Sequence, residues 1–419
     1  MNMARDRPTA RVARVGATIT LNTVLRRQMT LLREQGFEVV AICDADEWAP
    51  GIRCDGIEVW PLGMGTRPTP LALLRWGVRL YMLLRRSAVD VVHFHNAYHG
   101  LIGPMAARLA GVPSVVRTVH AWYYLDDGGV LRTRLYRSLE RFAARSVDAT
   151  LFLNREDFLR AADDRIVDPP KRHLIGNGID VAAFSARVAD ADPQEVRRAL
   201  GLGSEDFVVT MVARLSPPKD HSQLLDVLPS IVRRHPRVRL LLAGAGPRKD
   251  ELCARVAALG LGDVVHFLGH RDDVPQVLSA SDLSLLISSR EGFGRCLVES
   301  MVARVPVIAS DVAGIRDVVE HERTGLLVPF GDRCALEEAL LRTIESPELR
   351  ARLAQEAYSD AIGRLDEGHS ALRVGTIYQA LLVAAAASHK QFRRPALRDE
   401  AGEQPRLPEE RVQVDSHAT

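Results

Sequence analysis

Three features are scarce or missing in this sequence, and each absence excludes a class of protein. The 419 residues include only five cysteines, with neither a C-x-x-C pair nor the spacing of a metal site, so the sequence predicts no disulfide framework and suits a reducing compartment. The N-terminal stretch MNMARDRPTARVARVG lacks the apolar core of a signal peptide, and no apolar run approaches the roughly 20 residues of a membrane-spanning helix. We therefore predict a cytoplasmic protein, at most peripheral on the inner face of the plasma membrane.

A large net charge is also missing. The 55 basic and 53 acidic residues leave +2, which argues against a nucleic-acid-binding protein. The charge is nevertheless uneven, because the part up to Arg165 contains 23 arginines, no lysine and 17 acids. This basic first half fits either an anionic partner or arginines on solvated helix faces.

Strand and helix patterns alternate along the whole chain. Short runs rich in Val and Ile, such as FEVVAICD and VDVVHFHN in the first half and DFVVTMVARL and VPVIASD in the second, are separated by helical patterns. This alternation predicts an α/β protein with two Rossmann-like, doubly wound domains facing across a cleft. The predicted ranges are 1–183 for the first domain, 184–205 for a linker region, 206–365 for the second domain, 366–389 for a helix crossing back, and 390–419 for a disordered tail.

The stretch VARLSPPKDHSQ, residues 212–223, places two cations at the end of a predicted strand. Arg214 and Lys219 lie just before a predicted helix, and Asp220 and Gln223 have the spacing of a capping box. Cations beside a helix N-terminus suit a phosphate group. A solvated basic loop is the alternative interpretation.

The stretch SSREGFGRCLVES, residues 288–300, places two carboxylates beside a second predicted strand-to-helix turn. Gly292 and Gly294 allow the backbone to approach a ligand, and the helix that follows favours an anion. Glu291 and Glu299 would repel a diphosphate but would accept charge-assisted hydrogen bonds from hydroxyls. The combination points to a diphosphate with polyols on both sides, which is a nucleotide sugar.

These motifs together resemble glycosyltransferase family 4. EGFGRCLVE has the E-x7-E pattern of that family and VARLSPPKD its R-x4-K signature, while IGNGID, LLAGAGP, FLGHRDDVPQVLSASD and HERTGLLV follow the usual order. The first half resembles the branch that builds bacterial surface polysaccharides. The resemblance implies a GT-B fold and retaining transfer from a UDP- or GDP-sugar to a glycan or polyprenyl-linked acceptor, with no bound metal or other cofactor required.

The resemblance also implies roles for matching residues. Arg214 and Lys219 would hold the diphosphate, Glu299 the ribose, and Glu291 the transferred sugar. The remaining implied contacts to the donor come from Phe293 and Gly294 in the second domain and from Gly16 and His120 in the first.

Two departures from the family pattern concern these contacts. The first loop reads VGATITLNT without the Gly-Gly pair of many members, and DVAGIRD carries Ala313-Gly314 and Asp317 where many have Gly-Gly and a glutamate.

Other signals leave alternatives open. GAGPRK has Lys249 in place of the third glycine of a dinucleotide fingerprint. The incomplete fingerprint argues against a redox cofactor. His93, His95 and His99 favour structural or substrate-contact roles over a metal site. Residues 70–87 and 130–146 have basic and apolar faces, which fit either packing or an anionic membrane surface. A nucleotide-sugar epimerase or a non-catalytic sugar-nucleotide-binding subunit remains an alternative function.

Overall fold

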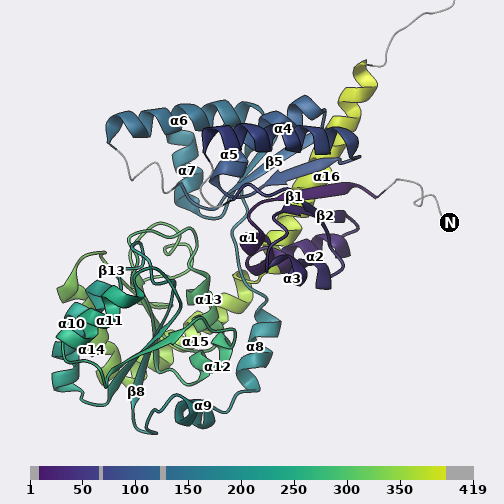
Figure 1. The fold of residues 1–419 in the computed structure, drawn as a ribbon. Helices are drawn as coiled ribbons and strands as arrows, with labels where there is room; N and C mark the ends of the chain where they lie inside the picture. The colour runs from purple at the N-terminus through teal and green to yellow at the C-terminus, as the bar shows by residue number, and fades with distance from the viewer. Residues whose placement is uncertain (1–8, 66–68, 123–128, 393–419) are drawn as a thin grey trace, which may run out of the picture.

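The computed structural model describes residues 9–65, 69–122 and 129–392, with 388–392 described by backbone alone. Two lobes lie one above the other in Figure 1. From residue 393 onward, the predicted tail lies outside the described residues. The predicted fold class, with two Rossmann-like lobes, is confirmed by two separate parallel sheets.

The first lobe is built on a parallel sheet with the order β3-β2-β1-β4-β5-β6-β7. The inner strands are buried on both faces, because helices cover both sides. The strands are β1 Arg11–Val15, β2 Glu38–Cys43, β3 Glu58–Pro61, β4 Val91–Phe94, β5 Ser114–Val119, β6 Ala149–Phe152 and β7 Arg172–Leu174. The helices are α1 Thr18–Thr23, α2 Arg26–Glu34, α3 Ala49–Cys54, α4 Pro70–Arg86, α5 Ala97–Ala110, α6 Val130–Arg145 and α7 Arg155–Asp163.

The second lobe repeats the scheme with the order β10-β9-β8-β11-β12-β13. Its strands are β8 Phe207–Val212, β9 Val238–Ala243, β10 Val265–Gly269, β11 Leu283–Leu286, β12 Val307–Ser310 and β13 Leu326–Val328. Its helices are α10 His221–Arg234, α11 Lys249–Ala258, α12 Val274–Ser279, α13 Arg295–Val302, α14 Arg333–Glu345 and α15 Pro347–Arg364. The order reverses between β8 and β11, where open parallel sheets bind ligands.

The region predicted as a linker, 184–205, is largely helical. It holds most of α8 Val181–Ala189 and all of α9 Pro193–Ala199, and both helices pack on α12 of the second lobe. Asp192 caps α9 by accepting from Gln194 N at 2.9 Å, and Pro193 occupies the first turn. The Asp-Pro pair therefore starts a helix, because proline lacks an N–H that the first turn would leave unpaired anyway.

Two chain segments cross between the lobes side by side. Ile179 N donates to Leu365 O at 3.1 Å, and Glu367 N donates to Ile179 O at 2.9 Å. A Cβ on Gly178 would lie 2.2 Å from Leu365 O, so this close approach requires glycine. The crossing is thus a short hydrogen-bonded pair of segments.

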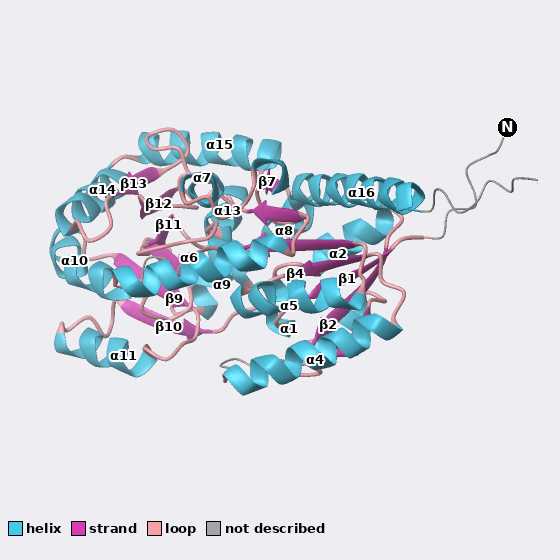
Figure 2. Cartoon of the chain, turned by 90° about the horizontal axis from the view of Figure 1, so that it is seen from above, coloured by secondary structure: helices cyan, strands magenta, loops and turns pink. Residues whose placement is uncertain are grey.

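Helix α16, Glu367–Phe392, returns to the first lobe and lies along α2 (Figure 2). By length and composition alone, its segment Glu367–Ala387 is long and apolar enough to cross a membrane. This corrects the expectation that no run approaches that length. Val374 and Tyr378 of this helix are fully buried in the first core, so its inner face packs against protein.

Candidate functional site

The loops that follow β8 and β11 are joined to each other at the reversal point of the second sheet. Asp220 N donates to Ile287 O at 3.0 Å, and Ser289 N donates to Pro218 O at 2.9 Å. The Ser288 hydroxyl also donates to Pro218 O at 2.9 Å. The R-x4-K loop and the loop that opens the E-x7-E segment therefore form one rigid unit.

Lys219 and Glu291, predicted separately from two motifs, form an ion pair in this unit. Only 21% of the lysine side chain and 10% of the glutamate side chain are exposed. Burial lowers the pKa of Lys219, since the charged form is poorly solvated there. Arg214 lies on the same loop with its side chain exposed. Asp220 accepts from Gln223 N at 3.2 Å, which is the N-cap half of the predicted capping box, but Gln223 Oε1 accepts from Gly331 N instead of Asp220 N.

Helix α13 starts directly behind this ion pair. Gly294 caps it, and Phe293 is buried beneath the loop. Gly314 holds the loop from the other side with φ +75°, and a Cβ there would lie 2.6 Å from Glu291 O. The Ala313-Gly314 variant of the family motif thus keeps the glycine that this contact needs.

Burial shifts the pKa values of two side chains of α13, Cys296 and Glu299. Burial raises the pKa of Cys296 to about 12, while the charge of Lys219 opposes that shift. Burial also raises the pKa of Glu299, and the charge of Arg295 opposes it. Glu299 is thus a desolvated carboxylate, ready to accept hydrogen bonds from hydroxyls.

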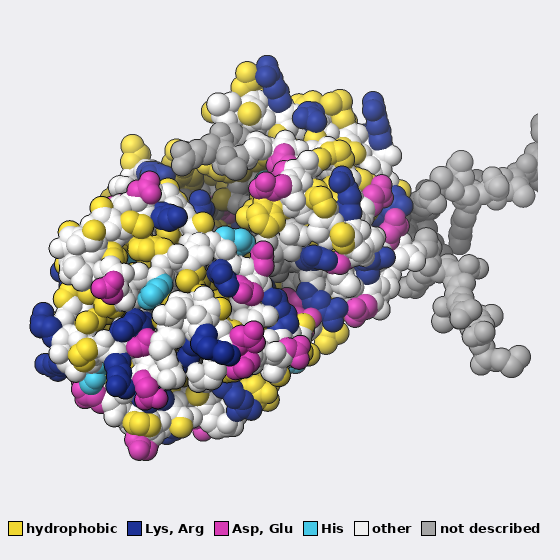
Figure 3. Space-filling view, turned by 60° about the horizontal axis from the view of Figure 1, so that its bottom comes forward, with side chains coloured by type: hydrophobic (Ala, Val, Ile, Leu, Met, Phe, Trp, Pro, Cys, Tyr) yellow, Lys and Arg dark blue, Asp and Glu magenta, His cyan; other side chains and the backbone are white. Residues whose placement is uncertain are grey.

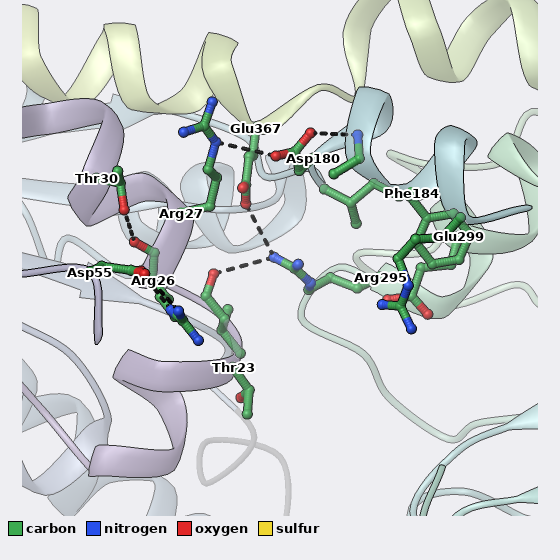
Figure 4. A pocket seen from close by; sticks show the side chains of 14 residues that line it. Thr23, Arg26, Arg27, Thr30, Asp55, Asp180, Phe184, Arg295, Glu299 and Glu367 are labelled. Atoms are coloured by element: carbon green, nitrogen blue, oxygen red, sulfur yellow. Dashed lines mark hydrogen bonds and ion pairs between the residues drawn. The ribbon is translucent and has the colours of Figure 1, made fainter. Parts of the chain in front are cut away.

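Glu299 lines a cavity of about 490 Å³ between the lobes (Figure 4). Arg295 reaches across it, with Nη1 3.3 Å from Val24 O and 3.8 Å from a Glu367 carboxylate oxygen. Arg27 pairs with Asp180 at 3.2 Å on the same wall. Burial raises the pKa of Glu367 to about 7. Both lobes and the start of α16 therefore contribute charged groups to this cavity.

The first lobe brings Gly16 and His120 to one place, at the carboxyl ends of β1 and β5. A Cβ on Gly16 would lie 3.0 Å from Asn96 Oδ1 and 3.2 Å from His95 Cβ. His95 Nδ1 lies 3.2 Å from His120 Nε2. Burial, and then the charge of Arg14, lowers the pKa of His120 to about 4. His120 is thus neutral, and it lines a small cavity of about 50 Å³ beside the N-terminus of α5.

A buried polar network lies behind His95 and His120. Arg14, fully buried, donates to the Tyr378 hydroxyl at 3.3 Å and to Gln28 Oε1 at 2.6 Å. His93 lies 2.5 Å from the Tyr378 hydroxyl through Nδ1 and 2.7 Å from Thr118 Oγ1 through Nε2. Burial lowers the pKa of His93 well below its usual value. His93 therefore has a structural position that ties α16 to the sheet.

The lobes also touch at the rim of the joined loops. Asn154, fully buried at the start of α7, donates to Gly292 O at 3.0 Å. Asp317 accepts from Arg155 N at 2.5 Å. Asp317, which stands where many family members have a glutamate, thus contacts the first lobe.

Three of these contact residues were not predicted from the sequence: Asn154, Arg295 and Glu367. The N-cap pattern Asn-x-x-Asp after a strand was the available signal for Asn154, since Asn154 accepts from Asp157 N at 2.7 Å. The contacts of Arg295 and Glu367 depend on how the two lobes pack together, so no local sequence pattern indicates them. Within the described parts of the chain, no group of three or more His, Cys, Asp or Glu is placed to hold a metal ion.

Comparison with sequence families gives two matches that divide the chain. Residues 192–360 match the family described as Glycosyl transferases group 1, and residues 20–178 match the Glycosyl transferase 4-like domain.

Individual relatives and solved structures extend these matches. The chain is 32% identical over 275 residues to the UDP-Gal:alpha-D-GlcNAc-diphosphoundecaprenol alpha-1,3-galactosyltransferase of Escherichia coli, covering 65% of this chain and 70% of the relative. It is 27% identical to the putative glycosyltransferase EpsD of Bacillus subtilis, covering 75% and 82%. The fold resembles Anabaena Alr3699/HepE in complex with UDP and glucose, with a TM-score of 0.74, 22% identity and coverage of 88% and 100%.

Proposed function

Because this chain belongs to the glycosyl transferase group 1 family and is a retaining glycosyltransferase of the GT4 type that transfers hexose or N-acetylhexosamine residues, we propose that its donor is a UDP- or GDP-sugar. The proposed acceptor is a glycan or polyprenyl-linked glycan of bacterial polysaccharide biosynthesis. The E. coli relative is named for UDP-Gal and a diphosphoundecaprenol acceptor, which favours UDP and a lipid-linked acceptor. Such an acceptor would place the enzyme at the cytoplasmic face of the membrane.

The observation that carries the donor proposal is the Lys219–Glu291 pair on the joined loops in front of α13. In this arrangement Lys219 and Arg214 would bind the diphosphate, with the N–H groups of α13 beside them. Glu291 would turn to a hydroxyl of the transferred sugar, near the backbone of Phe293 and Gly294. Glu299, which lines the cavity between the lobes, would accept from the ribose hydroxyls.

The first lobe would supply the remaining contacts. His120 is neutral, so it would offer a hydrogen bond to the sugar without adding charge. Gly16 would lie near the phosphates. We propose residues 1–183 as the acceptor-side domain, 206–365 as the donor domain, and 366–389 as the helix that joins them.

The proposed reaction is attack on the same face as the leaving group. The acceptor oxygen would form a bond to the anomeric carbon as the bond from that carbon to the phosphate oxygen breaks. The acceptor proton would pass to the leaving diphosphate. Lys219 and Arg214 would stabilise the charge that develops there, so we propose that donor binding needs no divalent cation.

A thermal-shift screen tests the donor proposal. UDP, GDP, and their glucose, galactose and N-acetylglucosamine conjugates would be added with and without EDTA. A ligand at one hundred times its dissociation constant adds about 2.7 kcal/mol of stability. We expect one nucleoside diphosphate to raise the melting temperature equally with and without chelator. No shift with any of them would contradict the proposal.

Incubation of the donor with and without acceptor separates the alternatives. Transfer to N-acetylglucosaminyl-diphosphoundecaprenol with retained configuration is the expected result. A change of the sugar in the absence of acceptor would identify the epimerase alternative. Binding without transfer or hydrolysis would identify a sugar-nucleotide-binding subunit.

A further inference from the structure

The exposed apolar side chains of this protein are concentrated on one face of the first lobe. More than half of the large hydrophobic residues exposed in the described chain lie on α4, α5 and α6. Leu74 is 64% exposed, Leu109 70% and Phe142 52%. These helices lie together along the outer side of the first lobe, at the top of Figure 1, with α5 in contact with both of the others. Contiguous apolar surface of this kind marks an interaction site.

A groove between α4 and α5 deepens this surface. Its volume is about 410 Å³, and side chains of Leu74, Val78, Tyr81, Ile102 and Met105 line it. On α6, the exposed residues Leu135, Leu139 and Phe142 continue the apolar stripe at helical spacing.

The charges on the same helices have one sign. Together α4, α5 and α6 contain ten arginines and a single acidic residue, Glu140. That glutamate is buried and paired with Arg117 at 2.6 Å, so it does not offset the surface charge. Arg75 and Arg79 are exposed, and the ion pairs found in the described chain do not include them. On the face shown in Figure 3, by contrast, basic and acidic side chains are interspersed over the second lobe.

We infer that this α4–α6 face, defined by Leu74, Val78, Leu109, Leu135 and Phe142 with Arg75 and Arg79, docks on an anionic phospholipid bilayer. The apolar side chains would enter the acyl boundary while the arginines meet lipid phosphates. A second copy of the chain fits this face poorly, because the arginines of both copies would face one another with no exposed carboxylate on these helices to pair with them.

The docking face is continuous with the first lobe's part of the site. Helix α5 carries Leu109 near its end, and its first residue, Ala97, lines the small cavity beside His120. A bilayer under α4–α6 would therefore lie on the lobe where the acceptor is proposed to bind. This inference deepens the proposed function and takes from it only the lipid-linked acceptor.

Vesicle co-sedimentation of the full chain tests the inference. The vesicles would contain phosphatidylglycerol and phosphatidylcholine in equal parts, or phosphatidylcholine alone. We expect binding to the anionic vesicles only. The double variant Arg75→Gln/Arg79→Gln should bind about 25-fold more weakly, since each arginine near an anionic surface contributes a factor of about five. The variant Leu74→Ser/Leu109→Ser should lose the binding that survives high salt.

The matched control is Arg233→Gln/Arg234→Gln, which removes two exposed arginines from the end of α10 in the second lobe. Equal losses of vesicle binding in this control and in Arg75→Gln/Arg79→Gln would overturn the inference. Unchanged vesicle binding of both the arginine and the leucine variants of the α4–α6 face would overturn it as well. Self-association that Leu109→Ser abolishes, without vesicle binding, would assign the face to a second copy and overturn it too.

The thermal shift with nucleoside diphosphate keeps the two proposals separate. The α4–α6 variants should retain the parent's shift, because none of their substitutions touches the donor site. A missing shift with normal vesicle binding would contradict the donor proposal and leave the docking face standing. A normal shift without vesicle binding would contradict the docking face and leave the donor proposal standing.

Discussion

The two lobes share one architecture, but the cation nearest each lobe's part of the site has different partners. In the second lobe, Lys219 and Glu291 pair with each other on a loop at the mouth of the sheet. In the first lobe, Arg14 is fully buried, and its partners are neutral, namely Tyr378 and Gln28. Charges at a loop can exchange one partner for a ligand, whereas an enclosed charge cannot move without breaking its surroundings. Substitutions should therefore affect catalysis in the second lobe and stability in the first.

The largest expected effect is that of Lys219→Ala on turnover. Loss of one preorganised charge contact at the transition state lowers kcat by about a hundred- to a thousandfold. Steady-state rates of donor turnover measure it, and urea unfolding of the same variant measures separately the cost of leaving the Glu291 carboxylate without its cation. Arg233→Ala, at an exposed position on α10, is the control. Near-normal turnover of the Lys219 variant would remove this residue from the proposed site.

Glu367 lies where α16 leaves the second lobe. It tests whether a substitution at this junction affects stability, as is expected for the first lobe. Its folded pKa is raised from 4.5 to about 7 by burial. Below pH 4.5 the carboxyl is protonated in both the folded and the unfolded chain, so its burial carries no penalty from ionisation. As pH rises to about 7, ionisation favours the unfolded chain, and the penalty reaches on the order of 3 kcal/mol.

Glu367→Gln should therefore match the parent in acid and exceed its stability above neutral pH. Urea unfolding across this pH range measures the difference, with Glu338→Gln, an exposed position on α14, as the control. A variant less stable than the parent above neutral pH would mean that the contact with Arg295 outweighs the burial of the carboxylate.

Tyr378→Phe removes one hydroxyl from the first lobe's buried network. Arg14 and His93 would each lose a partner, and an unpaired buried polar group costs about 1–3 kcal/mol. Thermal unfolding should show this loss while kcat changes little. A large fall in kcat at unchanged stability would show that the network acts on His120 in catalysis, and the contrast between the lobes would fail there.

Local patterns were sufficient to predict the sheet ends and the two motif loops. Arg214, Lys219 and Glu291 lie two to seven residues after the ends of β8 and β11, and Glu299 lies on the helix that follows, so short-range sequence carries their placement. The roles of these residues stay predictions.

The contacts that sequence reasoning missed join residues far apart in the chain. Asn154 bonds Gly292, and Tyr378 bonds Arg14. No periodicity reports such pairs, because they depend on how α16 and the two lobes pack. The helices within 184–205 were missed for another reason: proline and aspartate are signals both of a linker and of a helix start.

The smallest expected effect belongs to Asp317→Ala, at the rim where the lobes meet. Asp317 is exposed in part and accepts a hydrogen bond from Arg155 N, and a contact of this kind is worth about 0.5–1.5 kcal/mol. Because it holds the start of α7 beside the loop that carries Gly292, its loss should raise KM for the donor about three- to tenfold while kcat stays the same. Initial-rate kinetics at varied donor concentration measure this, with Asp311→Ala, whose carboxylate pairs with Arg316 on the same loop, as the matched control. An equal rise in both variants would place the effect in the loop itself, and the two lobes would then bind the donor without help from this rim contact.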